Sequence, residues 1–272
     1  MTARQLSYDD LFGESDLETF ARIDDLDLYT PPTDFDVELY TNNYKASEHC
    51  GDYISCKFDK PRNKVETATL VLKGNDPLVD MVMQCYETVV PITIANGGQR
   101  VWTGRVDTFD DAIVNGVNTV TCQLIGDWNW NNKVLCWPSF LLPIEAQFPT
   151  RALYIGPAIS CILFMWATQA FRLQSGIWEL VNNISDPQAW FGTLEMGQDL
   201  LTPVAVNWVN PLFDTSKWVS FSGRMDTLAK LVEQILKDNG LHLTIDLWLP
   251  GEPQPITGVT LKGPALVVNC VD

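Results

Sequence analysis

Carboxylates next to tryptophans are the side chains of this sequence that come closest to a catalytic arrangement. Asp110-Asp111 follows a predicted strand, and Asp127 stands directly before Trp128. Two carboxylates at the right separation suffice for glycoside hydrolysis, and the same stretch holds indoles that could stack on sugars: Trp128, Trp130 and Trp137. A structural interpretation is favoured. We expect Asp110-Asp111 in a turn, Asp127 as the side-chain cap of a helix, and the indoles in the core.

Histidine and cysteine chemistry has little support. His49 lies beside Cys50, with Cys56 further on, a spacing that fits no structural zinc pattern. The other histidine, His242, lies in a predicted strand. The usual sequence patterns of serine hydrolases, zinc proteases, phosphate loops and dinucleotide sites do not occur. The sequence therefore predicts no catalytic, cofactor-binding or metal-binding residue, and no enzyme.

Composition restricts the partners. The formal net charge of −16 over 272 residues disfavours binding to nucleic acid or to an anionic membrane. The seven cysteines are irregularly spaced, and no cationic and apolar leader opens the chain, which together predict reduced thiols and assembly in a cytoplasm. The longest apolar run, residues 158–171, is shorter than the roughly 20 residues of a membrane-spanning helix. It is expected to be a buried helix, with no stable membrane binding.

The N-terminal segment is strongly acidic. Residues 1–38 hold eleven Asp and Glu but only two arginines, Arg4 and Arg22. Such a composition buries little apolar area alone, which is typical of an extension that packs on a neighbouring subunit. The candidate interface residues are Leu11, Phe12, Leu17 and Phe20.

The first half of the chain alternates as β-structure does. Asp76 and Pro77 are typical of a helix start, and Asn96-Gly97-Gly98 is typical of a tight hairpin turn. The predicted elements are strands at 37–40, 53–58, 66–74, 91–95, 101–109 and 118–127, and helices at 76–87 and 128–137.

The second half mixes helices and strands. Asp226 or Thr227 is expected to cap an amphipathic helix that ends at Gly240. Residues 185–215 indicate a long loop or an insertion that contacts a partner. The predicted elements are helices at 158–171 and 225–240, and strands at 178–183, 218–224, 241–249, 258–263 and 265–270.

These elements predict an α+β fold that is mainly β, with two small antiparallel β-barrels, short helices and a helical and loop insertion. The predicted units are an acidic extension (1–36), a first barrel with helix 76–87 (37–137), the insertion (138–217) and a second barrel region (218–272). A strand, helix and hairpin occur in both halves, which suggests two similar barrels. A structural keystone is expected to close the end of the first barrel: Asp127, Trp128 and Trp137. Because the chain stops directly after an apolar strand, we expect a further region beyond Asp272.

Several stretches resemble siphophage tail proteins. VWTGRVDTFDD (101–111) and NTVTCQLIGDWNWNNKVLCWP (118–138) are similar to the strand–strand–helix core of tail-tip hub proteins. Three others look like minor tail proteins of phages that infect actinobacteria: IEAQFP (144–149), GPAISCILFMWATQAFRLQ (156–174) and DTSKWVSFSGRMDTLAKLVEQILKDNGLHLTIDLWLPGEPQP (214–255). The resemblance runs from about Val37 to Pro255, and the last stretch is its most specific part.

The resemblance implies a homotrimeric hub beneath the tail tube, similar to the hub of contractile-tail baseplates, with no catalytic residues carried over. Chains of this family are usually longer, and a cell-wall-degrading or receptor-binding activity is expected in the further part. The expected function is to join the sixfold tail tube to a threefold tip and to line the DNA exit channel during virus entry. Expected partners are the distal tail ring protein, the tape measure protein and other minor tail proteins, with DNA only in transit.

Two alternatives stay open. One is a carbohydrate-binding or cell-wall-hydrolysing module of a phage particle, which the tryptophans and carboxylates would suit. The other is a different tail component, such as a distal ring protein of sixfold symmetry. As a hub or as a ring protein, the chain is expected in the virion, after assembly in the host cytoplasm.

Overall fold

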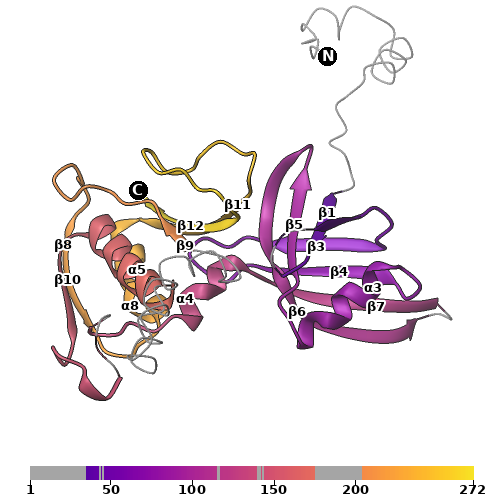
Figure 1. Cartoon of the computed structure of the whole chain (residues 1–272), viewed down its shortest axis with the longest axis horizontal. Helices are drawn as coiled ribbons and strands as arrows, with labels where there is room; N and C mark the ends of the chain where they lie inside the picture. The colour runs from indigo at the N-terminus through magenta and orange to yellow at the C-terminus, as the bar shows by residue number, and fades with distance from the viewer. Residues whose placement is uncertain are drawn as a thin grey trace, which may run out of the picture.

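The computed structural model describes residues 35–174 and 204–272, apart from residues 43, 45, 115, 116, 140, 141 and 143. Figure 1 shows two units side by side, a large sheet built from the first half and a mixed unit built from the second. Most of the acidic extension, its four apolar anchors (Leu11, Phe12, Leu17 and Phe20) and the predicted strand 178–183 lie outside the described residues.

The first unit is one seven-stranded antiparallel sheet, here called the large sheet. Its spatial order is β2-β1-β5-β6-β7-β4-β3. The strands are β1 Asp36–Tyr40, β2 Ser47–Cys50, β3 Ser55–Asp59, β4 Thr67–Lys73, β5 Pro91–Asn96, β6 Gln99–Val114 and β7 Val117–Gly126. β4 shows the alternation behind the sheet, because Ala68, Leu70 and Leu72 are buried while their neighbours are not.

The predicted hairpin turn is confirmed, whereas the helix begins one residue later than predicted, with Pro77 as its N-cap. Gly97 and Gly98 both have positive φ and join β5 to β6. α3 Leu78–Met83 and the 3-10 turn η1 Gln84–Tyr86 occupy the predicted helical stretch. The Asp76 carboxylate accepts a hydrogen bond from the Leu78 N–H at 2.9 Å. The buried side chains of α3 join the core of the large sheet.

The large sheet curls without closing. Phe35, next to β1, lies edge-on to Phe58 of β3 with ring centroids 5.2 Å apart, so the two sides of the sheet approach each other. No strand pairing joins them, and β2 and β3 remain the two edge strands. The predicted first barrel is therefore wrong, because the pairing that would close it is absent from the described residues.

The second unit places helices between two small sheets, and we call it the C-terminal unit (Figure 1). One sheet has the order β10-β8, and the other has the order β11-β12-β9. Its elements are η3 Ile144–Ala146, β8 Ala152–Pro157, α5 Ala158–Gln174, β9 Val204–Val206, β10 Trp218–Gly223, α8 Leu228–Asn239, β11 His242–Trp248 and β12 Ala265–Val271. α8 begins after Thr227, whose hydroxyl accepts from the Lys230 N–H, and ends at Gly240 as predicted.

The predicted second barrel and the internal duplication are both wrong. The C-terminal unit consists of two separate small sheets, and β9 runs parallel to β12, whereas all pairs of the large sheet are antiparallel. The two units thus share no strand order. The predicted strand 258–263 is a loop, and β8 and β9 lie in stretches where no strand was predicted. The coarser prediction of a mainly β, α+β chain with few helices is confirmed.

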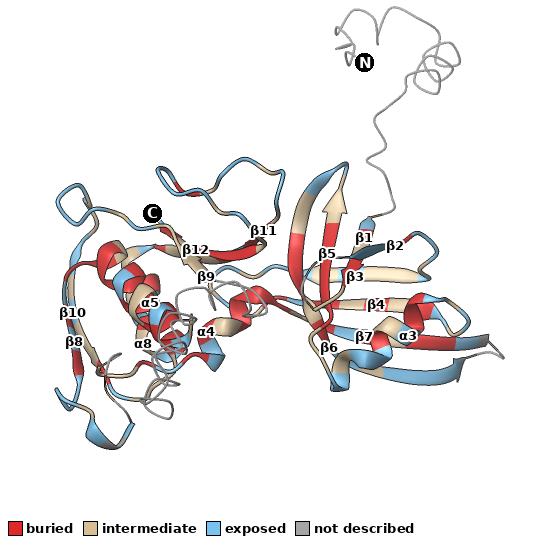
Figure 2. Ribbon diagram, in the orientation of Figure 1, coloured by how far each residue is buried: buried red, intermediate tan, exposed pale blue. Residues whose placement is uncertain are grey.

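Each unit has its own hydrophobic core. The core of the large sheet runs from Val37 to Leu124 along the chain, and that of the C-terminal unit from Val134 to Cys270 (Figure 2). α5 lies against β8, β9, β12 and α8 and contributes Ile162, Leu163 and Trp166 to this second core. It is the buried helix that the sequence predicts. No helix of the described residues is long and apolar enough to cross a membrane.

Candidate functional site

The segment that leaves the large sheet is the centre of the candidate site. β7 ends at Gly126, and a 3-10 turn, η2 Asp127–Asn129, leads into the short helix α4 Trp130–Lys133. Asp127 caps neither element: the N-cap is Gly126 for η2 and Asn129 for α4, and neither forms a side-chain cap. The expected cap is wrong because the Asp127 side chain turns inward, where its Oδ2 accepts a hydrogen bond from the Thr103 hydroxyl at 2.7 Å.

Two buried carboxyl groups lie at this end of the sheet. Burial raises the pKa of Asp127 to about 6, although the Thr103 hydrogen bond and the nearby Arg105 act in the opposite direction. Burial likewise raises the pKa of Glu66 to about 7, against the attraction of Lys60 at 3.8 Å. Charged carboxylates are poorly solvated here, so the protonated form of both groups is more stable relative to the charged form than it is in water.

Hydrogen bonds from Trp128 and from the turn that holds Arg62 and Asn63 join the two units. The buried Trp128 donates its indole N–H to the Leu243 carbonyl at 3.1 Å. Asn63, in the turn between β3 and β4, donates to the Leu241 carbonyl at 2.7 Å and accepts from the Leu243 N–H at 2.9 Å. Its neighbour Arg62 donates to the Gly240 carbonyl. The start of β11 is thus bonded to the large sheet much as a paired strand would be. We call this contact region the seam.

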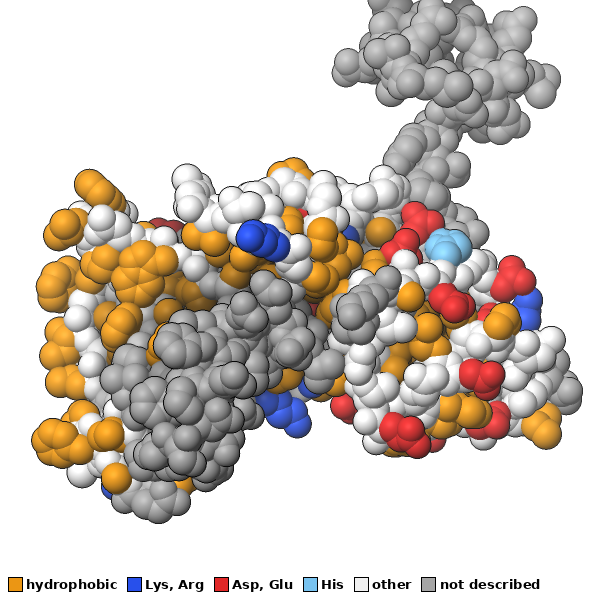
Figure 3. All heavy atoms as spheres, in the orientation of Figure 1, with side chains coloured by type: hydrophobic (Ala, Val, Ile, Leu, Met, Phe, Trp, Pro, Cys, Tyr) orange, Lys and Arg blue, Asp and Glu red, His pale blue; other side chains and the backbone are white. Residues whose placement is uncertain are grey.

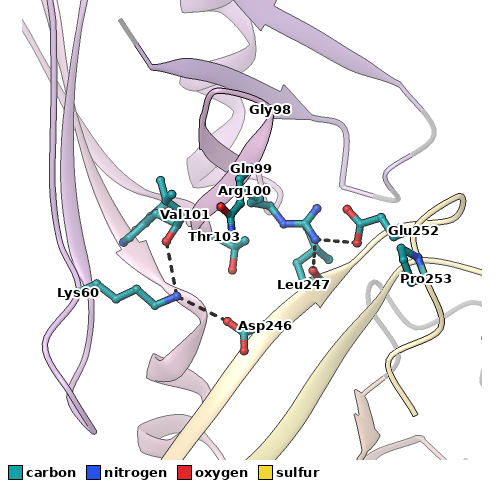
Figure 4. Close-up of a pocket in the computed structure, with 11 residues that line it drawn as sticks. Lys60, Gly98, Gln99, Arg100, Val101, Thr103, Asp246, Leu247, Glu252 and Pro253 are labelled. Atoms are coloured by element: carbon teal, nitrogen blue, oxygen red, sulfur yellow. Dashed lines mark hydrogen bonds and ion pairs between the residues drawn. The ribbon is translucent and has the colours of Figure 1, made fainter. Parts of the chain in front are cut away.

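Ion pairs extend the seam along β11 (Figure 4). Arg100 of β6 donates to the Leu247 carbonyl at 2.5 Å and to Glu252 at 2.8 Å. Lys60 lies 3.6 Å from Asp246. These side chains line a cavity of about 440 Å³ between the units, and every charge in it has a partner of opposite sign. Such an arrangement holds two units together and leaves little charge for a ligand.

The remaining tryptophans of this stretch do not form a sugar platform. Arg105 lies over the Trp130 ring at 5.2 Å, and Arg172 lies over the Trp137 ring at 4.3 Å. Trp128 is 8% exposed. The expectation that this element closes the end of the first barrel is also wrong, because Trp128 bonds to β11 and Val134 belongs to the core of the C-terminal unit.

The other candidate residues are scattered. Asp110 and Asp111 lie within β6, opposite Thr121 and Val120, and not in the expected turn. Both are exposed, and the buried Asp127 is hydrogen-bonded to Thr103 of the same sheet. In the described part of the chain, no three potential ligands come together to hold a metal ion.

The comparison with known proteins decides the family. Residues 36–272 match the model of the Siphovirus ReqiPepy6 Gp37-like proteins. The chain belongs to this family. Two relatives are the minor tail proteins Gp28 of Mycobacterium phage L5 and of Mycobacterium phage D29, which are 26% and 25% identical to it over 243 and 240 residues. Each alignment covers 84% of this chain and 38% of the relative, so the chain spans about two fifths of their length.

Solved structures with some likeness are tail proteins as well. The 43 kDa tail protein of prophage MuSo2 from Shewanella oneidensis aligns over 86% of this chain and 54% of its own, with 12% identity and a TM-score of 0.39. A tail protein from Neisseria meningitidis gives the same score over 50% of its length. The predicted resemblance to siphophage minor tail proteins is confirmed by the family match and the two mycobacteriophage relatives.

The seam of this Gp37-like chain could not be found from the sequence. Sequence analysis singled out Asp127 and Trp128, which lie in the seam, and Trp137, which lies against Arg172 in the C-terminal unit. It missed Asn63 and Arg100, whose partners lie more than a hundred residues away along the chain. The only local signal is the Pro61-Arg62-Asn63 turn, where Asn63 has positive φ, a conformation that asparagine tolerates.

The buried carboxyl groups predict how stability depends on pH. Glu66 and Asp127 titrate near 7 and 6 in the folded chain, against ordinary values of 4.5 and 3.8. Between these values the folded chain keeps protons that the unfolded chain has lost. The contribution of the two groups to the free energy of unfolding is therefore fully present below about pH 4, and it is lost as the pH rises through 6 and 7. We expect the free energy of unfolding to be higher at pH 5 than at pH 8, by roughly 2 kcal/mol from Glu66 alone.

Urea denaturation at the two pH values measures this difference. Glu66→Gln should remove most of the Glu66 contribution, whereas Glu233→Gln on the exposed face of α8 should leave the difference unchanged. A Glu66→Gln chain with the full pH dependence of the wild type would contradict the assignment.

Proposed function

We propose that this chain is a structural hub subunit of a siphophage tail tip, present as a homotrimer, which joins the sixfold tail tube to a threefold tip. The observation that carries the proposal is the family match over residues 36–272, with relatives that are minor tail proteins. The seam supports the proposal, because the hydrogen bonds of Asn63, Arg100 and Trp128 fix the two units in one orientation. A subunit that connects two neighbouring proteins needs such a fixed orientation. Its proposed place is the virion tail tip, after assembly in the host cytoplasm.

The two units would meet different neighbours. Since they share no strand order, a trimer would present three surfaces of each kind rather than six equivalent ones. We assign the distal tail ring protein, the tape measure protein and other minor tail proteins as partners. The hub would have no stable membrane contact.

Surface charge supports a place beside passing DNA. In Figure 3 acidic side chains gather over the large sheet, and exposed Asp107, Asp110 and Asp111 follow one another along β6. A wall of this sign repels phosphate and binds no DNA, whereas lysines and arginines would hold it. The large sheet is thus the part we propose to face the DNA exit channel.

The alternative is a carbohydrate-binding or cell-wall-hydrolysing module. One observation favours it: a cavity of about 270 Å³ beside the seam is lined by Glu66, Trp128 and His242 among others, and burial raises the pKa of Glu66 to about 7. Against it, the Trp128 indole is buried and its N–H is bonded to Leu243. The hub proposal therefore assigns this chain no enzymatic activity.

Labelled particles and a glycan assay separate the two. Gold-labelled antibody against this chain should mark the tail tip of intact phage, and isothermal titration with peptidoglycan fragments should show no saturable binding. Label elsewhere on the particle would contradict the hub. Binding that is lost in Trp128→Phe, with stability unchanged, would establish the alternative.

A further inference from the structure

An apolar groove that no described residue covers runs along β8 in the C-terminal unit. β10 pairs with one edge of β8, and no described strand pairs with the other. Beside β8 lies a groove of about 370 Å³. It is lined mostly by apolar side chains from β8, α5 and the loop after β9, among them Leu153, Ile155, Phe164, Trp208 and Pro211.

The outer face of β8 and the start of β10 carries exposed apolar side chains, whereas Ser220 and Ser222 occupy the rest of that face on β10. Tyr154 points inward and stacks on Phe221, with ring centroids 5.0 Å apart. Its neighbours Leu153 and Ile155 point outward and are 65% and 61% exposed, and Trp218 of β10 is 76% exposed. Figure 3 shows hydrophobic side chains along this end of the molecule. A contiguous apolar surface of this kind is typical of a protein contact.

Basic residues stand at both ends of the β8–β10 pair, in contrast to the net acidic charge of the whole chain. Arg151 precedes β8, Arg224 follows β10, and the Lys217 carbonyl accepts from the Ala158 N–H at the far end of β8. All three side chains are exposed, and within the described residues none lies in an ion pair. Two acids of this region have partners of their own. Asp214 accepts from Ser160 and Ser216, and Asp226 pairs with Lys230 and also attracts Arg151.

We propose that this groove binds residues 1–34 of a second copy of the chain. The inference rests on the proposed function, because it needs copies assembled side by side. The segment has the complementary chemistry: it is rich in Asp and Glu, and Leu11, Phe12, Leu17 and Phe20 supply apolar side chains for the groove. Its carboxylates would meet Arg151, Lys217 and Arg224 at the rim, which gives orientation and specificity to an apolar contact.

The positions of the units favour a second copy over the same one. The segment joins the fold at β1 of the large sheet, whereas β8 and β10 lie at the opposite end of the molecule (Figure 1). Copies packed end to end bring the start of one β1 next to the groove of the next. A contact between two different surfaces closes into a ring when its rotation allows, which is what a trimer requires.

Photo-crosslinking in the full chain tests the inference. Phe12 is replaced by benzoyl-phenylalanine, equal amounts of ¹⁵N-labelled and unlabelled chain are mixed and irradiated, and the cross-linked peptides are identified by mass spectrometry. We expect links from position 12 to residues 153–164 and 208–211, half of them between a labelled and an unlabelled copy.

Matched variants identify the contact. Leu153→Glu with Ile155→Glu should lower the yield of these links roughly tenfold, since it places charge in the apolar groove and repels the acidic segment. Arg151→Glu with Lys217→Glu should lower it roughly threefold. Ile113→Glu, an equally exposed change on the large sheet, is the control and should leave the yield unchanged. Circular dichroism checks that each variant is folded.

Links within one copy, links to another surface, or no links would each overturn the inference. The proposed function is scored separately, by the presence of the same chain at the tail tip of labelled particles. A chain that reaches the tip without links to the groove overturns the groove assignment alone. Groove links in a chain that is absent from tails overturn the hub alone.

Discussion

Trp166→Ala is expected to lower the free energy of unfolding by about 3–5 kcal/mol, the largest single effect in the C-terminal unit. Trp166 is 1% exposed and lies in the middle of α5. Its indole N–H donates to the Asn131 side chain at 2.9 Å, and the buried Asn131 donates to the Trp128 carbonyl at 3.0 Å. The substitution therefore opens a cavity and leaves a buried acceptor without its donor.

Urea denaturation followed by circular dichroism measures the loss. Trp218→Ala is the matched control, because that indole is 76% exposed and its removal should change stability by less than about 0.5 kcal/mol. Equal losses in the two variants would show that α5 is not at the centre of this core.

Gly104→Ala is expected to destabilise the large sheet by about 3 kcal/mol or to prevent its folding. A Cβ at this position would lie 2.5 Å from the Trp102 ring and would meet the Ile125 carbonyl of β7 even more closely. Trp102 is fully buried and the carbonyl belongs to the backbone, so neither can move aside cheaply.

Gly263→Ala is the control for this prediction, since a Cβ there meets nothing within 4 Å. The midpoint of thermal unfolding should fall by several degrees in Gly104→Ala and stay within about a degree of the wild type in Gly263→Ala. An unchanged midpoint in both variants would contradict the close packing of β6 against β7.

Local patterns predicted most elements, because the information for them is local. The hairpin around Gly97-Gly98 and the helix between Thr227 and Gly240 follow from residues that stand next to one another. The buried helix α5 follows from an unbroken apolar run. β8 was missed because its outward residues, Leu153 and Ile155, are apolar, so the polar alternation of a half-exposed strand is absent.

Tertiary arrangement was predicted poorly, because it depends on pairs far apart in the sequence. Whether a curled sheet closes depends on its edge strands, and β2 and β3 stay unpaired. A repeated strand, helix and hairpin is too common a pattern to indicate duplication, and the strand orders of the two units differ. Asp127 stands where a cap is expected, yet the Thr103 hydroxyl on the neighbouring strand offers its carboxylate a buried partner instead.

The seam was not predicted for the same reason. Asn63 bonds to Leu241 and Leu243 across the molecule, and Arg100 reaches Leu247 and Glu252. Nothing near Asn63 or Arg100 in the sequence indicates those partners. The tail-protein resemblance, by contrast, was visible in the sequence alone, and the family match confirms it.

A symmetry-resolved electron cryo-microscopy reconstruction of the phage tail tests the hub most directly. The proposal predicts three copies of this chain in one ring at the tail tip, with the acidic strand β6 of each large sheet facing the channel. Six copies or one copy per ring, or a channel wall lined by lysines and arginines, would contradict it.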